Sequence, residues 1–441
     1  MSAKLLLTSV KAHQGLKGTI RVPGDKSISH RAVMFSSLAN GSSKITGLLE
    51  GEDVMATLAA FSAMGVEAEG PNDGVLTIHG VGMRGLQEPR EDLDMGNSGT
   101  AMRLMMGILA AQNFASKLVG DESLSSRPMR RVSVPLISMG ARCATDDNGC
   151  PPVHIRAAEA LESITYKLPV ASAQIKSALL LAGLYASGET CVTEPAPTRD
   201  HTERMLRAYG YACVTERLDD QVSAIHVTGG GELTATDIEV PADISSAAFF
   251  MVAASIVPDS SIILEHVCVN PTRTGIVDIL KAMGGDIRLL NPRAVGGEPV
   301  ADIQVNYVGL KGCEIDPKLV PLAIDEFPII CIAAACAEGQ TIVSGAEELR
   351  HKESDRISAM VEGLRNIGVD VVEQRDGMVV TGGSISGGSI ESFHDHRIAM
   401  SFAVAGCVSD GEVVINGAET VATSFPNFKE LANQVGLNIV D

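Results

Sequence analysis

Phe61-Ser62-Ala63-Met64-Gly65-Val66-Glu67-Ala68-Glu69 is the stretch that decides the fold, because its pattern returns five more times along the 441 residues. A short helical segment closes on a glycine, and a run of β-type residues follows it. The glycine suits the left-handed backbone conformation that commonly ends a helix. The six closing glycines lie 68 to 84 residues apart, at Gly65, Gly140, Gly210, Gly284, Gly368 and Gly436. Fixed-period similarity of this kind predicts six related subfolds.

Each copy shares a second pattern upstream of its closing glycine. A polar loop is followed by an alanine-rich helix and a short strand, and paired strands such as residues 75–80 complete the copy. The unit therefore reads strand, helix, strand, helix, strand, strand. At roughly 70 residues it is longer than a solenoid repeat, so we expect a small α/β subfold rather than one link of a rod.

Six copies divide most simply into three plus three. The stretch RVPGDKSISHRA at 21–32 is echoed by EVPADISSAAFF at 239–250, which supports two halves of like fold. We expect an N-terminal domain of residues 21–240 with repeats one to three, and a C-terminal domain of residues 1–20 plus 241–441 with repeats four to six. The hinge is expected near residues 20–22 and 240–242. A cleft between such halves is the natural place for a ligand.

The charge total narrows the possible functions. The chain has 35 Lys and Arg against 54 Asp and Glu, which gives a formal net charge of −19. This balance argues against an affinity that rests on a broad basic field for nucleic acid or anionic membrane. Aromatic residues make up 3% and Trp is absent, so few stacking platforms exist for single-stranded nucleic acid. Taken literally, the charge total also argues against anionic small substrates, although it does not say where the positive residues are concentrated.

Membrane spans and disulfides are not indicated by the sequence. The longest apolar stretches, residues 247–258 and 328–337, are shorter than the roughly 18 residues that a membrane span needs. The N-terminal residues do not show the pattern of a cleaved signal peptide. Nine cysteines without a C-x-x-C pair are typical of reduced, scattered thiols. We therefore expect a cytoplasmic protein that needs neither a metal nor another cofactor.

Unusual polar residues gather in the loops before the first helix of each repeat. These loops read GDKSISHR (24–31), GNSGTAMR (96–103), ASAQIKS (171–177), ADISS (242–246), IDEFP (324–328) and HDHRIAM (394–400). Helix N-termini offer unpaired N–H groups and a positive dipole end, which favour phosphate and carboxylate. An alternative is that the small polar residues are ordinary N-caps, namely Asp25, Ser27, Asn97, Ser172 and Ser245. That alternative leaves the adjoining cations unexplained, which are Lys26, Arg31, Arg103 and Arg397.

A second set of cations precedes the later helices of the repeats, comprising Arg127, Arg199, Arg273, Lys352 and Arg356. Arginine binds phosphate and carboxylate oxygens with two parallel hydrogen bonds, and lysine can serve as a point charge or a proton carrier. Taken singly, each is a solvated surface charge as readily as a ligand. Their recurrence at equivalent loops favours a shared anion site.

Two acids adjoin these loops. Asp325 precedes an apolar run and Glu353 follows Lys352, so a cleft could tune one as a base and the other as an acid. The alternative for Glu353 is an acid in the first turn of a helix, where it complements the helix dipole.

Three further motifs have weaker functional interpretations. Residues 80–85 (GVGMRG) fit G-x-G-x-x-G, but the following LQEPRED has a proline and no helical period, which disfavours dinucleotide binding. His394-Asp395-His396 could resemble metal ligands, but the sequence has no second ligand pair and Arg397 would repel a cation. No G-x-x-x-x-G-K-[ST] sequence occurs, which removes the usual NTPase interpretation.

Together the motifs resemble the 5-enolpyruvylshikimate-3-phosphate synthase family of enolpyruvyl transferases. The resemblance runs end to end and in order through RVPGDKSISHRA (21–32), GNSGTAMR (96–103), SRPMRR (126–131), ASAQIKSALLLAGL (171–184), TRDHTERML (198–206), NPTRTG (270–275), IDEFPI (324–329), ELRHKESDRI (348–357) and DHRIAMSF (395–402). It implies a two-domain inside-out α/β barrel with three βαβαββ repeats per domain. It also implies transfer of the enolpyruvyl group of phosphoenolpyruvate to the 5-hydroxyl of shikimate 3-phosphate, with release of phosphate through a tetrahedral intermediate.

The resemblance assigns roles to residues at matching motif positions. Shikimate 3-phosphate is expected to contact Lys26, Ser27, Arg31, Ser172, Ala173, Gln174, Arg199, Asp325 and Lys352. Phosphoenolpyruvate is expected to contact Lys26, Asn97, Gly99, Arg127, Gln174, Arg356, His396 and Arg397. Asp325 would accept the 5-hydroxyl proton with help from Lys26, and Glu353 would protonate the methylene carbon. The partners implied are these two small molecules, with no nucleic acid or membrane, and a monomeric chain is expected.

Two departures from the better-known members of the family concern the donor site. The class I enzymes carry a lysine shortly before T-F-P, whereas this chain reads Ala422-Thr423-Ser424-Phe425-Pro426 and so resembles class II. Class II members commonly have alanine where Gly99 stands, and that methyl group is associated with tolerance of glyphosate. We therefore expect Gly99 to leave room for glyphosate, and inhibition at concentrations comparable to those of phosphoenolpyruvate.

Two competing functions can be tested against the residues. The sister family, UDP-N-acetylglucosamine enolpyruvyl transferase, has Lys-Asn where this chain has Lys26-Ser27, and a cysteine where this chain has Glu122. A non-catalytic protein that binds phosphorylated ligands would explain the arginines but has no need of Asp325 and Glu353.

Overall fold

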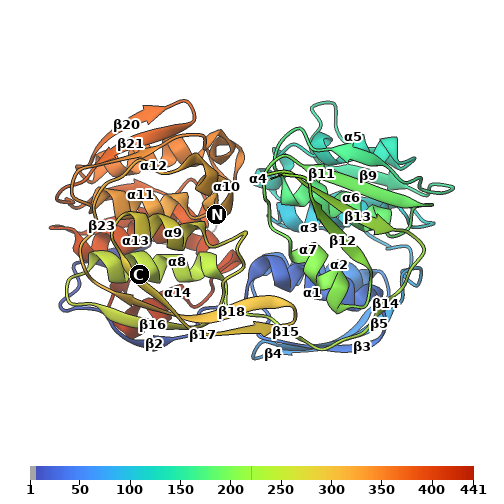
Figure 1. The fold of residues 1–441 in the computed structure, drawn as a ribbon, viewed down its shortest axis with the longest axis horizontal. Coiled ribbons are helices and arrows are strands. Elements are labelled where there is room, and N and C mark those ends of the chain that lie inside the picture. The colour runs from blue at the N-terminus through green and yellow to red at the C-terminus, as the bar shows by residue number, and fades with distance from the viewer. Residues whose placement is uncertain (1–5, 220) are drawn as a thin grey trace. The chain divides into compact units, whose positions relative to one another are not determined.

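The computed structural model describes residues 6–219 and 221–441, which form two compact units (Figure 1). Unit 1 comprises the described residues up to Pro23 together with Pro241–Ala294 and Pro299–Asp441. Unit 2 comprises Gly24–Val240 and the short segment Val295–Glu298. The chain therefore passes from one unit to the other four times along its length.

Unit 2 is built from the first three repeats, and each repeat has a sheet of its own. The helices are α1 (Lys26–Leu38), α2 (Glu52–Ala63), α3 (Gly99–Leu109), α4 (Glu122–Ser125), α5 (Arg130–Ser138), α6 (Ala173–Gly183) and α7 (His201–Ala208). The first sheet has the order β14-β3-β5-β4, with β15 also pairing β3, from β3 (Ala39–Thr46), β4 (Glu67–Asn72), β5 (Val75–Val81), β14 (Leu233–Thr234) and β15 (Ile238–Glu239). The second has the order β6-β7-β9-β8, from β6 (Leu93–Asp94), β7 (Ser116–Val119), β8 (Arg142–Ala144) and β9 (Val153–Arg156). The third has the order β10-β11-β13-β12, from β10 (Thr165–Lys167), β11 (Glu189–Glu194), β12 (Cys213–Arg217) and β13 (Ser223–Thr228).

Unit 1 is built from the last three repeats and takes two strands from the N-terminal segment. Its helices are α8 (Ile244–Ile256), α9 (Gly275–Ala282), α10 (Val320–Ala323), α11 (Phe327–Ala335), α12 (Arg356–Asn366), α13 (His396–Ala405) and α14 (Phe428–Val435), with short 3-10 turns at Pro317–Leu319, Glu347–His351, Gly406–Val408 and Ala418–Thr423. One sheet, β17-β18-β16-β2, consists of β2 (Lys17–Ile20), β16 (Ser261–Cys268), β17 (Asp286–Val295) and β18 (Glu298–Asn306). Another, β22-β23-β1-β24, consists of β1 (Leu6–Val10), β22 (Gly388–Glu391), β23 (Val413–Asn416) and β24 (Asn438–Val440).

The remaining sheet of unit 1 shows how far one repeat departs from the others. It has the order β19-β21-β20, from β19 (Gln340–Val343), β20 (Asp370–Gln374) and β21 (Gly377–Thr381). The strand that opens the other repeats is here reduced to isolated bridges, Lys311 with Glu338 and Glu314 with Ile342. The chain of the fifth repeat thus follows the same path as in the other repeats, but fewer of its residues are paired by backbone hydrogen bonds between strands.

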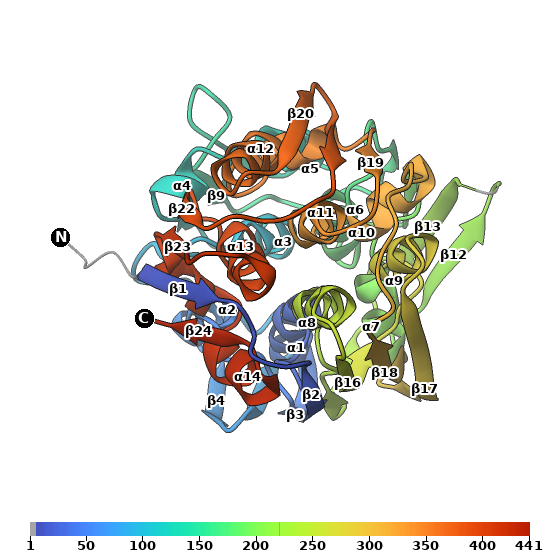
Figure 2. The ribbon, with the colours of Figure 1, turned by 90° about the vertical axis from the view of Figure 1, so that its left-hand side faces the viewer.

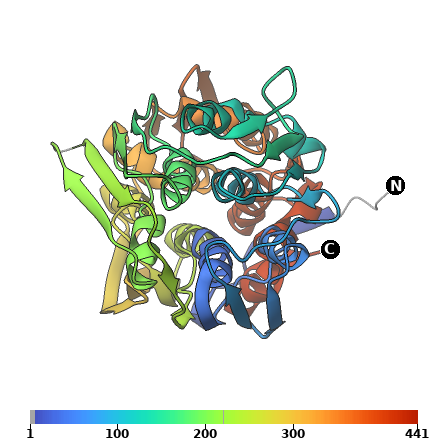
Figure 3. The same cartoon turned by 90° about the vertical axis from the view of Figure 1, so that its right-hand side faces the viewer.

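The helices that follow the polar loops lie inside each unit, and the sheets lie outside. All 13 residues of α8 and all nine of α11 are buried, which fits their nearly continuous apolar sequences. The strands alternate instead, as in β11, whose every second residue is buried. Figure 2 shows α8, α11 and α13 end-on within unit 1, and Figure 3 shows the central helices of unit 2 in the same way. In the described residues the sheets stay separate, so the inside-out arrangement contains no closed β-barrel.

The six closing glycines adopt the conformation predicted for them. Their φ angles are all positive, from +78° at Gly210 to +107° at Gly436. An L-amino acid with a side chain rarely adopts such a φ, so glycine allows each helix to stop and the chain to turn into its next strand. The prediction made from residues 61–69 is confirmed at all six positions.

Within the described ranges, no helix is both long enough and apolar enough to cross a membrane. Among the described residues, the nine cysteines form no disulfide bond.

Candidate active site

In unit 2 the predicted residues stand where the central helices begin. Lys26 and Ser27 open α1, Gly99 opens α3, and Ala173 and Gln174 open α6. The first turn of a helix has backbone N–H groups without partners inside the helix, and the dipole there is positive. Each of these three helices thus presents anion-binding groups at its first turn.

The structure shows which of the small polar residues are N-caps and which only lie next to one. Asp25 caps α1 by accepting a hydrogen bond from the Ile28 amide at 2.9 Å, and Ser172 caps α6. Ser27 lies inside α1, while the caps of α3 and α8 are Ser98 and Asp243. The N-cap interpretation is therefore correct for Asp25 and Ser172 and wrong for Ser27, Asn97 and Ser245. It fails by one or two residues, because neighbouring small polar residues can all serve as caps and only the backbone decides between them.

Ser27, Arg31 and Arg199 come together in unit 2. The Arg31 guanidinium donates through Nη1 to the Ser27 carbonyl at 2.9 Å, and Arg199 Nη1 lies 3.5 Å from Ser27 Oγ. Arg31 is buried, and burial lowers its pKa to about 10 although Glu203 acts in the opposite direction. The guanidinium is therefore still charged at neutral pH. Two cations and a hydroxyl on one side of α1 can hold an anionic group.

Asn97, Gly99, Arg127 and Gln174 form a second group in unit 2. Arg127 donates to the Asn97 side chain at 2.6 Å and to the Asn97 carbonyl at 3.1 Å. Arg103 donates to Gln174 Oε1, and Gln174 donates in turn to Thr100 Oγ1 at 2.9 Å. A methyl group placed on Gly99 would lie 3.0 Å from Arg103 Nη1 and 3.5 Å from Arg127 Nη1. The missing side chain of Gly99 thus keeps the space between two guanidinium groups open.

Lys26 has a partner that sequence reasoning missed. Its ammonium group forms an ion pair with the buried carboxylate of Asp53, at the start of α2. Asp53 resembles an ordinary first-turn acid in the sequence, and no motif distinguishes it from Glu52. The pair shows that Lys26 is held in place by a fixed negative charge.

In unit 1 the predicted acids and cations form one ion-pair network. Lys352 Nζ donates to Asp325 Oδ1 at 3.0 Å, and Arg356 Nη1 reaches the same oxygen at 3.5 Å. Arg356 Nη2 donates to Glu353 Oε2 at 2.7 Å. Arg397 Nη1 donates to the backbone carbonyl of Asp325 at 3.0 Å. The sequence predictions for Asp325, Lys352, Glu353, Arg356 and Arg397 therefore meet at one place in the unit.

Asp395 anchors this network. Arg356 Nε donates to its Oδ2 at 2.8 Å, Ser354 Oγ donates to the same oxygen at 3.0 Å, and the Arg397 amide donates to Oδ1 at 2.9 Å. Burial alone raises the pKa of Asp395, but Arg356 outweighs it and lowers that pKa below its ordinary value. Burial likewise lowers the pKa of Arg356, and Asp395 and Glu353 more than reverse this effect. Both groups are therefore ionised at neutral pH, and Asp395 holds the guanidinium of Arg356 while it caps α13 at the Arg397 amide.

His396 lies at the first position of α13, buried between Asp395 and Arg397. His394 instead faces Glu419, with Nδ1 3.0 Å from Oε1. In residues 6–219 and 221–441, no group of three or more His, Cys, Asp or Glu side chains could hold a metal ion. Asp395 acts here as a helix cap and as the partner of an arginine.

Glu326 is a further residue that the sequence motifs did not single out. Its buried carboxylate contacts the Ser245 hydroxyl and lies 3.6 Å from Arg397 Nη1. Ser245 also accepts a hydrogen bond from Arg273 at 2.7 Å. Asp325 and Glu326 therefore have different partners. Asp325 forms an ion pair with Lys352, whereas Glu326 lies beside the guanidinium of Arg397.

Residues 10–431 match the family model described as EPSP synthase (3-phosphoshikimate 1-carboxyvinyltransferase). The chain belongs to the EPSP synthase family. A 3-phosphoshikimate 1-carboxyvinyltransferase from Hydrogenovibrio crunogenus is 58% identical over 426 residues, covering 96% of both chains. One from Methylococcus capsulatus is 57% identical over 424 residues, again covering 96% of each. A solved EPSP synthase structure from Acinetobacter baumannii superposes with a TM-score of 0.88 at 54% identity, covering 99% of each chain.

Membership of the EPSP synthase family confirms the fold and the activity predicted from the motifs. The chain has the two-domain inside-out α/β fold of that family. It is an enzyme that transfers the enolpyruvyl group of phosphoenolpyruvate to shikimate 3-phosphate, in the shikimate pathway of aromatic amino-acid biosynthesis. The 58% identity extends over 96% of the chain and so includes residues of both units.

Proposed function

We propose that unit 2 supplies most of the substrate-binding groups of this EPSP synthase, and that unit 1 supplies its acid and base. The observation that carries the proposal is the ion-pair network of unit 1, in which Asp325, Lys352, Glu353 and Arg356 are linked by contacts of 2.7 to 3.5 Å. Two carboxylates held by two cations are suited to moving protons rather than only to binding an anion.

The proposed contacts of shikimate 3-phosphate are in both units. In unit 2 they are Lys26, Ser27, Arg31, Ser172, Ala173, Gln174 and Arg199, and in unit 1 they are Asp325 and Lys352. Support comes from the group around Ser27, where two arginines contact one serine. Helix N–H groups at Ala173 and Gln174 add donors that carry no side-chain entropy cost.

The proposed contacts of phosphoenolpyruvate include the second group of unit 2. They are Lys26, Asn97, Gly99, Arg127 and Gln174 in unit 2, with Arg356, His396 and Arg397 in unit 1. Arginine forks suit both the phosphate and the carboxylate of this donor. Asn97 and Ser123 hold Arg127 in one orientation, which reduces the entropy lost when the donor binds.

The proposed reaction is an addition followed by an elimination. Asp325, assisted by Lys26, takes the proton of the 5-hydroxyl, whose oxygen attacks C2 of phosphoenolpyruvate while Glu353 donates a proton to C3. The tetrahedral intermediate then loses phosphate and a proton from C3, which restores the carbon–carbon double bond. Arg356 contacts Glu353 in this structure, and an anionic donor bound to Arg356 would weaken that contact. Glu353 would then be free to carry the proton.

We also propose that the enzyme acts as a monomer in the cytoplasm, without nucleic-acid or membrane partners, and that glyphosate inhibits it. The net charge of −19 supports the absence of polyanionic partners. The open space beside Gly99 supports access for glyphosate.

The direct test is phosphate release from phosphoenolpyruvate with alternative acceptors. We expect release with shikimate 3-phosphate and none above background with UDP-N-acetylglucosamine. Release with the nucleotide sugar alone would contradict the assignment of the acceptor site. Substitution of Asp325 by Asn is expected to abolish the release that occurs with shikimate 3-phosphate.

A further inference from the structure

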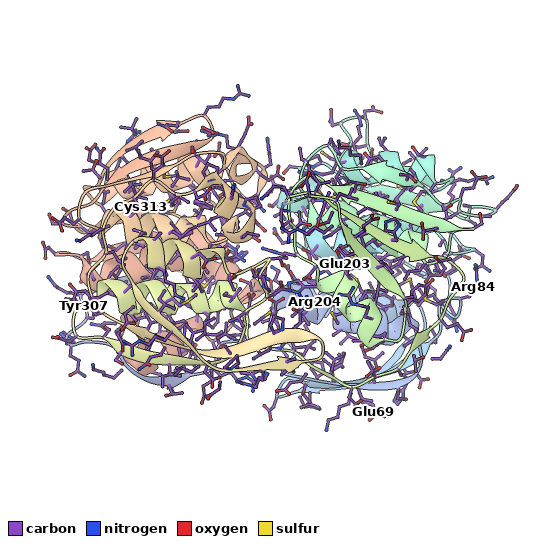
Figure 4. All side chains as sticks on the ribbon, viewed as in Figure 1. Glu69, Arg84, Glu203, Arg204, Tyr307 and Cys313 are labelled. Atoms are coloured by element: carbon purple, nitrogen blue, oxygen red, sulfur yellow. The ribbon has the colours of Figure 1, made fainter. Side chains whose placement is uncertain are left out.

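Unit 2 contains a buried ammonium group that the proposed reaction does not use. Lys176 lies on α6, and its side chain has no solvent exposure. Its Nζ lies 2.9 Å from Glu194 Oε2 and 2.7 Å from Glu203 Oε1, and both carboxylates are buried. Glu203 is on α7, where Figure 4 labels it.

The cluster is costly to bury, so a purely structural role explains it poorly. Removing several charged groups from water carries a penalty that their mutual attraction only partly offsets, and apolar residues of similar volume often stabilise a protein as well or better. Arg31 adds a second buried cation, whose charge interacts with that of Glu203. The buried cluster therefore needs a reason other than stability.

The two glutamates flank the loop that carries Arg199. Glu194 ends β11 before this loop, and Glu203 lies in the first turn of α7 after it. Glu194 Oε2 also accepts a hydrogen bond from Thr198 Oγ1 at 2.6 Å, and Thr198 directly precedes Arg199. Lys176 therefore joins both ends of the loop and, through Glu194, holds the residue next to Arg199.

The neighbours of the cluster hold Arg31. Thr202, which precedes Glu203, accepts from Arg31 Nε at 2.7 Å. Ser177, which follows Lys176, accepts from Arg31 Nη2 at 2.9 Å and from Thr202 Oγ1 at 2.8 Å. A shift of α6 relative to α7 would therefore move the acceptors of Arg31 as well as the loop of Arg199.

We propose that Lys176 is a positioning residue for the acceptor substrate, because it fixes Arg31 and Arg199 through Glu203, Glu194 and the loop between them. The inference rests on the proposed function, in which these arginines hold shikimate 3-phosphate. Lys176 touches neither substrate in this proposal. Its effect is specific to the acceptor, since its ion pairs lead to the loop of Arg199 and not to Arg127 or the network of unit 1.

The test replaces one positive and one negative charge together. Lys176→Met alone would leave two buried carboxylates without a partner, whereas Lys176→Met with Glu194→Gln keeps the net charge and leaves Glu203 beside Arg31. We expect the dissociation constant of shikimate 3-phosphate, measured by titration calorimetry, to rise about tenfold, as when a remote change misplaces a binding group. The KM for phosphoenolpyruvate, measured at saturating shikimate 3-phosphate, should change by less than about twofold.

A matched control loosens the same part of the fold without touching the charges. Ser36 on α1 and Tyr209 at the end of α7 share a buried contact of 2.7 Å between their hydroxyl oxygens. Tyr209→Phe should lower the melting temperature and leave the affinity for shikimate 3-phosphate unchanged. Equal weakening of acceptor binding in the control and the double variant would overturn the positioning role.

One further variant keeps the proposal testable if the double variant does not fold. Thr198→Val removes only the hydrogen bond from the loop to Glu194, and we expect it to weaken acceptor binding several-fold with an unchanged KM for phosphoenolpyruvate. Normal acceptor affinity in Thr198→Val, with an unfolded double variant, would show that the cluster is structural.

Arg199→Met separates failure of this inference from failure of the proposed function. If Arg199→Met binds shikimate 3-phosphate normally, the assignment of the acceptor site is wrong. If it binds weakly while the double variant binds normally, only the role of Lys176 is wrong. Combining Arg199→Met with the double variant should give less than the product of the separate effects, because both act on one contact.

Discussion

Arg356 in unit 1 lies between three carboxylates, and this position determines what each of them can do. Its guanidinium is 2.8 Å from Asp395, 2.7 Å from Glu353 and 3.5 Å from Asp325. Asp395 is fully buried and also caps α13, so it is the permanent partner. Glu353 and Asp325 are more exposed than Asp395, so their contacts with Arg356 are less shielded from solvent.

Glu353→Gln tests the assignment of the acid. Gln cannot donate the proton to the methylene carbon, so we expect kcat to fall at least about 100-fold, the usual size of a lost general acid. The dissociation constant of shikimate 3-phosphate should stay within about twofold, because Glu353 is not among its proposed contacts. Phosphate release and titration calorimetry measure the two quantities.

Glu347→Gln is the matched control for this substitution. Glu347 pairs with Arg375 at the surface, in the turn that precedes Glu353. We expect normal kcat in this variant. Turnover retained in Glu353→Gln would show that another group donates the proton.

Asp395→Asn tests the anchor of the network. Arg356 holds the pKa of Asp395 below its ordinary value, so the pair stabilises the fold above the unfolded pKa of about 3.9 and this contribution is lost as the pH falls through the folded pKa. We expect the variant to lose roughly 3 kcal/mol of unfolding free energy at pH 7, because Arg356 stays buried without its charged partner. Urea melts between pH 7 and pH 3 give the unfolding free energies of the variant and the unchanged protein. We expect the difference between these free energies to shrink as the pH falls. A constant difference across this range would contradict the assignment of the pKa shift.

Gly99→Ala tests access to the donor site. The new methyl group would lie 3.0 Å from Arg103 Nη1, tight enough to displace a flexible guanidinium but not the backbone. We expect the glyphosate concentration for half inhibition to rise at least about tenfold, which is the smallest discrimination that one extra methylene group usually produces in a pocket. The KM for phosphoenolpyruvate should rise less. If the unchanged enzyme withstands a large excess of glyphosate over phosphoenolpyruvate, Gly99 does not control access.

At the scale of elements, the closing glycines give the clearest test of the repeat. Gly284 has φ +89°, and no described atom beyond its own chain neighbours lies within 4 Å of the place that a Cβ would occupy, so its substitution isolates the backbone effect. We expect Gly284→Ala to lower the unfolding free energy by about 1 kcal/mol, since a left-handed conformation disfavours a side chain. Gly383→Ala is the control, because a Cβ at Gly383 would have as much room as at Gly284 while the φ of Gly383 is not in the left-handed region. We expect this variant to change the unfolding free energy by less than about 0.5 kcal/mol. Equal effects in urea melts would refute the conformational argument.

The sequence predicted the elements around these glycines well, because helix ends and strand alternation are local signals. It was less reliable at the other end of the helices, where Ser98 and Asp243 act as caps instead of Asn97 and Ser245. It also did not anticipate that the strand opening the fifth repeat is reduced to bridges at Lys311 and Glu314. Backbone pairing of that kind depends on neighbouring strands, which no local window contains.

At the scale of the whole molecule, the repeats and the family motifs were enough to predict the fold and the reaction. Most of the ion pairs were not predictable, because they join residues far apart in the chain. Asp325 and Lys352 are 27 residues apart, and Arg356 and Asp395 are 39. Lys176 shows the same limit, since nothing in ASAQIKS indicates that Glu194 and Glu203 will meet it. The acidic total of −19 was misleading about substrates, because both substrates of this enzyme carry a phosphate group.

The distribution of exposed apolar side chains argues for a monomer. In the described residues, the large exposed ones are spread over several elements, with Val134 and Ile137 on α5, Val214 on β12 and Val372 on β20. A permanent homodimer generally buries a continuous apolar surface of about 2,000 Å² or more, and two side chains on one helix cannot supply it. We therefore expect sedimentation equilibrium at micromolar concentration to give the mass of a single 441-residue chain, with and without shikimate 3-phosphate. The mass of two chains would contradict the prediction, and Ile137→Asp would then show whether α5 forms the contact.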